Sequence, residues 1–125
     1  MDTEIPSGIL ITDSRVDTDR LRALVVQHFG DMVKLVVDVR RRVVALGGEL
    51  HADAEAVLLE RGSRQADLWG ANYYPGLGAS QCIEFTALIN IRPAEGNRSM
   101  QIQDSHVREM VREIVHELVG RGEPL

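Results

Sequence analysis

The chain has 125 residues, of which 44% are hydrophobic and 26% are charged, and its formal net charge is -5. This length allows one domain with its own core but not two, and the composition is typical of a globular domain. The negative net charge argues against binding to duplex DNA, and no apolar run approaches the length of about 20 residues that crosses a bilayer. The acidic start also lacks the features of a signal peptide. We therefore expect a cytoplasmic protein that binds neither duplex DNA nor membranes.

The first half of the chain predicts a short strand, two helices and a β-hairpin. Asp17 or Thr18 can cap the first helix, and Gly30 follows its end. Two β-branched runs flank the arginine triplet at residues 40–42, which is the pattern of a hairpin. In chain order we expect a flexible lead-in at residues 1–8, an edge strand at 9–11, a helix at 19–29, strands at 33–39 and 43–46, and a helix at 52–61.

The second half predicts strands followed by one long helix. Residues 83–92 alternate apolar and polar side chains, as a strand with one buried face does. Pro93 ends this strand, and residues 98–102 return to the same face, so we interpret residues 83–102 as a β-hairpin. In chain order we expect a strand at 68–74, a mobile loop at 75–80, strands at 83–92 and 98–102, an amphipathic helix capped by Asp104 or Ser105 and ended by Gly120, and a tail at 121–125.

Together these elements predict a single α+β domain over residues 9–120. Hairpins and short connections dominate, so we expect a mostly antiparallel sheet of about five strands with about three helices packed against it. If the apolar stripe of the last helix is wider than one sheet can cover, it would also support a homodimer.

Five short motifs occur in combination: DVR at residues 38–40, GGELHADAE at 47–55, LLERGS at 58–63, LWGAN at 68–72, and INIRP with GNRSM between 89 and 100. With this combination the chain resembles, over about residues 9–120, a small prokaryotic family of domains of unknown function. The resemblance implies a single domain, and it brings no assigned activity, substrate or catalytic residue.

The segment between residues 49 and 55 is one candidate for chemistry. If the backbone is extended, Glu49 and His51 share one side, whereas in a helix His51 and Glu55 lie one turn apart on the same face. Such a pair can be a general base oriented by a carboxylate, or two ligands of a divalent metal. The segment matches no standard metal signature, and Cys82, the only cysteine, cannot build a thiolate zinc site by itself. The alternative is structural, because carboxylates at a helix start complement the helix dipole.

The end of the predicted 83–102 hairpin is the other candidate. Asn90, Arg92, Asn97 and Arg98 gather there, and the two guanidinium groups suit a carboxylate or a phosphate. The alternative is that Asn97 makes the turn while the arginines cover the hairpin end.

One hypothesis joins both candidates in a single cleft. Its polar lining would be Glu49, His51, Asn72, Asn90, Arg92 and Arg98, with Trp69 or Tyr73 as a wall. The first function that we expect is the binding of an anionic small molecule or an acidic partner segment through Arg92, Arg98 and Asn97 near Glu49 and His51. The alternative is a small hydrolase or transferase, with or without a metal, in which His51 is the general base and Glu49 or Glu55 orients it. Single-stranded nucleic-acid binding is disfavoured by the net charge. No cofactor is indicated.

Overall fold

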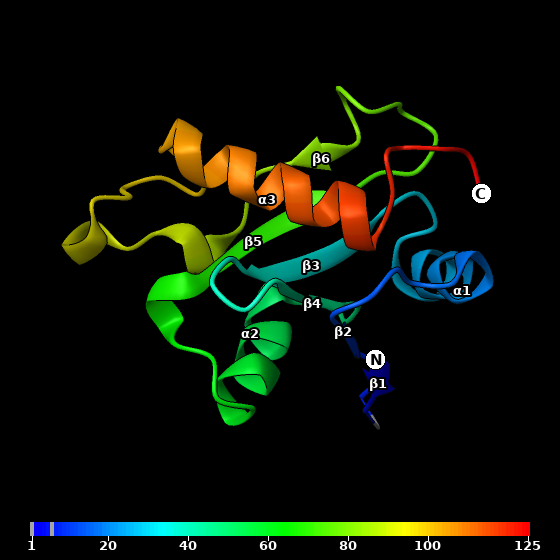
Figure 1. The fold of residues 1–125 in the computed structure, drawn as a ribbon, viewed down its shortest axis with the longest axis horizontal. Helices are drawn as coiled ribbons and strands as arrows, with labels where there is room; N and C mark the ends of the chain where they lie inside the picture. The colour runs from blue at the N-terminus through cyan, green and yellow to red at the C-terminus, as the bar shows by residue number, and fades with distance from the viewer. Residues whose placement is uncertain (1, 6) are drawn as a thin grey trace.

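A six-stranded antiparallel sheet forms the centre of the fold, in the strand order β1-β2-β4-β3-β5-β6 (Figure 1). The structure is a computed structural model that describes residues 2–5 and 7–125. The strands are β1 (Asp2–Glu4), β2 (Leu10–Thr12), β3 (Val33–Asp38), β4 (Val43–Leu46), β5 (Leu68–Tyr73) and β6 (Ile83–Glu84). Every strand pair is antiparallel, which confirms the predicted fold class.

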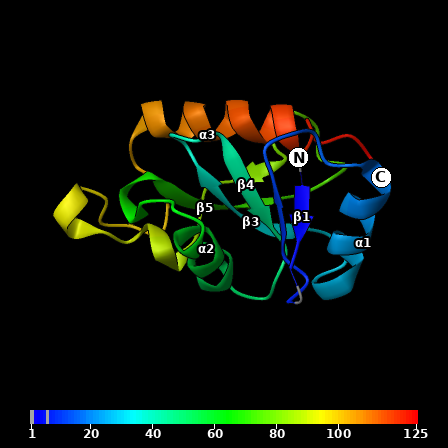
Figure 2. The ribbon, with the colours of Figure 1, turned by 60° about the horizontal axis from the view of Figure 1, so that its bottom comes forward.

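Helices cover both faces of this sheet (Figure 2). The α-helices are α1 (Thr18–His28), α2 (His51–Glu60) and α3 (Ser105–Leu118), and three short 3-10 turns are η1 (Gln65–Asp67), η2 (Leu88–Asn90) and η3 (Pro93–Glu95). The larger core packs α1 and α3 on the face of the sheet that carries Leu35, Val37 and Tyr73. The smaller core packs α2 on the opposite face, against Val36 and Leu68. The second face is the one that carries the candidate site.

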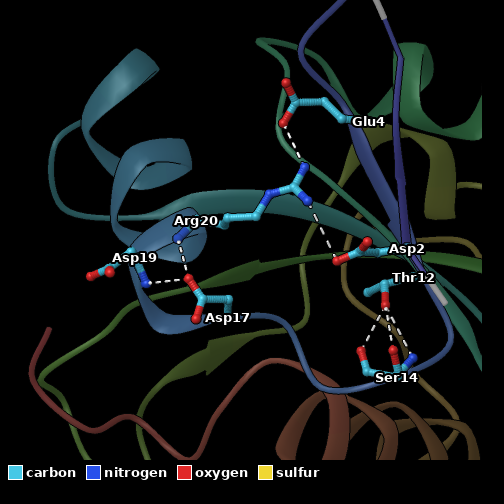
Figure 3. A network of polar contacts seen from close by, with 7 residues as sticks. All are labelled: Asp2, Glu4, Thr12, Ser14, Asp17, Asp19 and Arg20. Atoms are coloured by element: carbon cyan, nitrogen blue, oxygen red, sulfur yellow. Dashed lines mark hydrogen bonds and ion pairs between the residues drawn. The ribbon is translucent and has the colours of Figure 1, made fainter.

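Local capping fixes the starts of two helices. The carboxylate of Asp17 accepts hydrogen bonds from the backbone N–H groups of Asp19 and Arg20 at 3.1 and 3.3 Å (Figure 3), and Asp104 caps α3 in the same way. Asp17 and Asp104 therefore satisfy N–H groups that a helix start would leave without partners. Each cap was one of two residues expected from the sequence.

The N-terminal segment adds a strand that the sequence pattern did not indicate. Asp2–Glu4 pairs with β2, so β2 lies inside the sheet and the expected edge position of this strand is wrong. The guanidinium of Arg20 lies 2.9 Å from Glu4 and 3.5 Å from Asp2, which holds β1 to α1 (Figure 3). The prediction failed because the side chains of Asp2–Glu4 are not buried in the core and show no apolar alternation. Of the expected lead-in, Met1 and Pro6 lie outside the described residues.

The predicted hairpin at residues 83–102 is wrong in its two continuous strands, although the chain does reverse there, with antiparallel bridges between Thr86 and Gln101 and between Arg92 and Asn97. Only Ile83–Glu84 pairs with β5, and residues 98–102 contribute a single bridge, between Gln101 and Thr86. The side chain of Asn90 takes the place of a strand partner, because its amide bonds both the N–H and the carbonyl of Gly70 in β5. The apolar alternation also fails at its end, since Ile91 is exposed.

Candidate functional site

A cavity of about 420 Å³ opens on the α2 face of the sheet. Its walls come from the first turn of α2, from strands β3, β5 and β6, and from residues 86–89. About half of the lining is apolar, and the polar side chains are Lys34, His51, Asn72, Tyr74, Glu84 and Thr86. This size and mixture fall in the range of small-molecule sites.

Three polar side chains of this cavity form a row across the sheet. Lys34 of β3 is the register partner of Asn72 in β5, and Asn72 is in turn the register partner of Glu84 in β6. Residues directly opposite on antiparallel strands project from the same face. A lysine and a glutamate therefore stand on either side of a buried asparagine.

His51 is the first residue of α2 and its side chain is buried, with 8% of the residue exposed. Its Nε2 lies 2.9 Å from the carbonyl oxygen of Ala71. Because a carbonyl only accepts hydrogen bonds, Nε2 carries the proton and Nδ1 of the neutral ring keeps its lone pair. Burial lowers the pKa of His51 below its ordinary value of 6.5, and the charge of Lys34 lowers it further. The bond to Ala71, the adjacent side chain of Asn72 and the charge of Glu84 oppose this effect. The ring is therefore neutral at pH 7.

A hydrogen-bond network orients the amide of Asn72. Its Nδ2 donates to Oε1 of Glu84 at 2.8 Å, and the hydroxyl of Tyr74 donates to the same oxygen at 3.3 Å. Burial and the adjacent charge of Glu84 raise the pKa of Tyr74, which keeps this hydroxyl a donor. The carboxylate thereby fixes which amide atom is the nitrogen. Oδ1 of Asn72 is then a buried acceptor that has no hydrogen-bond partner among residues 2–5 and 7–125.

The amino end of α2 also borders the cavity. Leu50 occupies the N-cap position and has no side chain that could bond the first N–H groups of the helix. These groups and the helix dipole make such an end favourable for negative charge. Leu50, Leu88 and Met100 line the cavity and are 57%, 70% and 40% exposed, so they form an apolar rim.

The two glutamates that were expected beside His51 lie elsewhere. Glu49 is exposed and borders a separate hollow with His28, whose Nδ1 lies 4.0 Å from the carboxylate of Glu49. Glu55 does not line the His51 cavity, and its Oε2 is buried without a hydrogen-bond partner in the described part of the chain. The group that orients His51 is the carbonyl of Ala71 rather than a carboxylate.

Arg92 is committed to the scaffold. Its guanidinium lies 4.1 Å from the ring centroid of Trp69, donates to the carbonyls of Gln65 and Leu68, and lies 3.6 Å from Glu95. Burial lowers the pKa of Arg92, and the negative charges nearby oppose that effect. Trp69 belongs to the core on the α3 face, so it does not form a wall beside His51.

The remaining candidates at the former hairpin end differ in their surroundings. Asn90 and Asn97 are buried, and both use their amides on backbone groups. Arg98 is exposed, and its backbone N–H donates to Oε1 of Gln103. Of the nine candidate residues, the cavity brings together only His51 and Asn72.

Sequence reasoning missed Lys34, Tyr74 and Glu84. One signal for Lys34 was available, because it is the only lysine of the chain and stands within a β-branched run. Its position next to Asn72 and Glu84 depends on the register of three strands, which the sequence pattern does not specify.

Within residues 2–5 and 7–125, no three His, Cys, Asp or Glu side chains stand close enough together to hold a metal ion. None of the helices in these ranges has the length and apolar character to span a membrane.

The fold and the cavity define a small α+β domain with an antiparallel sheet and a partly apolar site beside a neutral histidine. The chain belongs to the family DUF5674, described as proteins of unknown function, whose model matches residues 10–118. This match confirms the resemblance to a family of unknown function. No curated protein and no solved structure matches the chain.

Proposed function

We propose that this protein binds a small molecule in the cavity beside His51. The observation that carries the proposal is the unpaired Oδ1 of Asn72 in the wall of a cavity of about 420 Å³. A buried acceptor without a partner costs about 1–3 kcal/mol, and native structures hold few of them. A bound molecule that brings a hydrogen-bond donor offsets this cost.

Binding without chemistry is favoured over catalysis. A hydrolase or transferase would use His51 as its general base, and the lone pair on Nδ1 is compatible with that role. However, among the described residues no carboxylate bonds the ring, and Thr86 is the only side chain with a hydroxyl, apart from Tyr74, in the lining of the cavity. A nucleophile activated by His51 would have to be within hydrogen-bond reach, and no such bond to Thr86 is present in the described residues.

In this proposal the arginines expected to bind an anion are replaced by Lys34 and the amino end of α2. The terminal nitrogens of the Arg92 guanidinium and the amide of Asn97 donate to backbone carbonyls, which leaves Arg98 as the one exposed guanidinium of the predicted pair. A negative group on the ligand is better served by Lys34 and the amino end of α2, since both border the cavity. A cytoplasmic location and a homodimer stay predictions.

A cavity-filling variant tests the proposal. Ala52 is exposed on α2 and lines the cavity, so the large side chain of Ala52→Trp occupies space that a ligand would need. Ala56→Trp is the matched control, because Ala56 is exposed on the same helix but borders the hollow near Glu49.

The assay is backbone NMR of the labelled protein during titration with amino acids, amines, carboxylic acids, alcohols and nucleosides. We expect at least one class to shift signals of residues 50–52, 72–74 and 84–89 in the wild type and in Ala56→Trp, but not in Ala52→Trp. The proposal fails if no class shifts these signals, or if the shifts persist in Ala52→Trp.

A further inference from the structure

We propose that the ligand of the His51 cavity is a zwitterion of the amino-acid type, with its ammonium on Glu84, its carboxylate on Lys34 and an apolar side chain on the rim of Leu50, Leu88 and Met100. This inference rests on the proposed function and names its ligand class.

The first support is the separation of opposite charges along one wall. Lys34 and Glu84 flank Asn72 in the register of three neighbouring strands. Two strand spacings put their Cα atoms about 10 Å apart, and long side chains can approach one molecule from both sides. In the described part of the chain neither residue forms an ion pair; the ammonium of Lys34 lies 5.2 Å from the ring centroid of Phe29.

The acceptors suit an ammonium group. Oε1 of Glu84 accepts from Asn72 and Tyr74, which leaves the second carboxylate oxygen for the ligand. Asn72 and His51 also line the cavity, and the unpaired Oδ1 of Asn72 and the lone pair on Nδ1 of His51 are further acceptors. A primary ammonium has three N–H donors and no acceptor, so it matches this set. The neutral ring of His51 also spares the ammonium a like charge.

The donors suit a carboxylate. Lys34 is the one cationic side chain that lines the cavity within the described residues. The amino end of α2, which has no side-chain cap at Leu50, adds the positive end of the helix dipole. Between these ends the apolar rim leaves space for a side chain of moderate size.

The test compares L-leucine with two truncated relatives, 3-methylbutan-1-amine and 4-methylpentanoic acid, by NMR titration of the wild-type protein. A single partly exposed charge pair contributes up to about 1 kcal/mol, so we expect L-leucine to bind about fivefold more tightly than either relative. This comparison needs no variant.

Two isosteric variants then separate the charged ends. We expect Glu84→Gln to lower the affinity for L-leucine and for the amine about fivefold and to leave the affinity for the acid unchanged. Lys34→Met should lower the affinity for L-leucine and for the acid to the same extent and leave the affinity for the amine unchanged. Glu49→Gln and Arg98→Gln, which change charges outside the cavity, are the controls and should change none of the three affinities.

Each other outcome contradicts the inference in a distinct way. If the acid or the amine alone binds as tightly as L-leucine, the ligand is not recognised as a zwitterion. If neither Glu84→Gln nor Lys34→Met changes affinity, the two charges do not contact it. If compounds of another class shift the cavity signals, and these shifts are absent in Ala52→Trp, the binding function stands and only the ligand class is wrong. If no class binds, both proposals fail.

Discussion

Replacing Asn90 by alanine should strongly lower the free energy of unfolding, because this side chain joins β5 to the segment that follows β6. Asn90 is fully buried, and its Oδ1 accepts from the N–H of Gly70 at 2.9 Å. Its Nδ2 donates to the carbonyls of Gly70 and Met100, both at 3.0 Å. No neighbouring backbone strand takes over these bonds in the described structure.

The expected magnitude follows from those three bonds. Each contributes about 1 kcal/mol, and each buried group left without a partner adds a desolvation cost of about 1–3 kcal/mol, offset in part because the amide itself is no longer buried. We therefore expect Asn90→Ala to lower the free energy of unfolding by about 3–5 kcal/mol. Asn90→Asp has the same shape but faces two carbonyls with a carboxylate, so at pH 7 it should destabilise at least as strongly.

Urea unfolding followed by circular dichroism measures this change directly. If Asn90 were instead a binding residue, as its place among polar neighbours suggested, Asn90→Ala would keep its stability and lose only ligand affinity. A loss of unfolding free energy below about 1 kcal/mol, with an unchanged urea dependence, would therefore refute the structural role.

Two further predictions concern groups with perturbed titration or packing. The pKa of His51 is lowered by burial, so below about pH 6.5 the unfolded chain binds more protons than the folded one, and stability falls as the pH drops. Thermal unfolding should therefore show that stability decreases less between about pH 7.5 and about pH 5.5 in His51→Gln than in the wild type. The pKa of His116 is lowered in the same direction, so part of the decrease should remain in that variant, and an unchanged decrease would contradict the prediction for His51. Arg92→Met should cost about 2–3 kcal/mol in urea unfolding, because it removes the contact with Trp69 and two bonds to carbonyls, whereas the exposed Arg98→Met should stay within about 0.5 kcal/mol; equal effects would contradict the difference in burial.

The helices and the central hairpin could be predicted because their signals are local. An aspartate that bonds the first N–H groups of a helix lies within three residues of them, as Asp17 and Asp104 do. The β-branched runs of β3 and β4 are joined by a short turn, and the buried Asp38 closes that turn through the N–H groups of Arg40 and Arg41. For these elements, neighbours in the sequence are also neighbours in space.

The second hairpin could not be predicted correctly because its alternation has another cause. Ala87 is buried and Ile89 is partly buried against β5, which satisfies the pattern without a continuous strand. The polar position that would have faced solvent is Asn90, which turns inward instead and bonds β5 with its side chain. Apolar periodicity reports which side chains are buried, and it does not report whether the backbone or a side chain completes the hydrogen bonds.

The site residues were predicted less well than the helices, because the cavity depends on residues that are far apart in the sequence. The polar runs at residues 49–55 and 90–98 looked functional because their members are adjacent in the sequence, yet the structure uses most of them for turns and scaffold contacts. The cavity depends instead on Gly70, where an added Cβ would lie 2.5 Å from Ala87 and 3.2 Å from the ring of His51. The missing side chain lets the first turn of α2 and the 86–89 segment approach β5 together and form facing walls. Residues from three separate segments, 47–55, 68–72 and 89–93, thus line this one cavity.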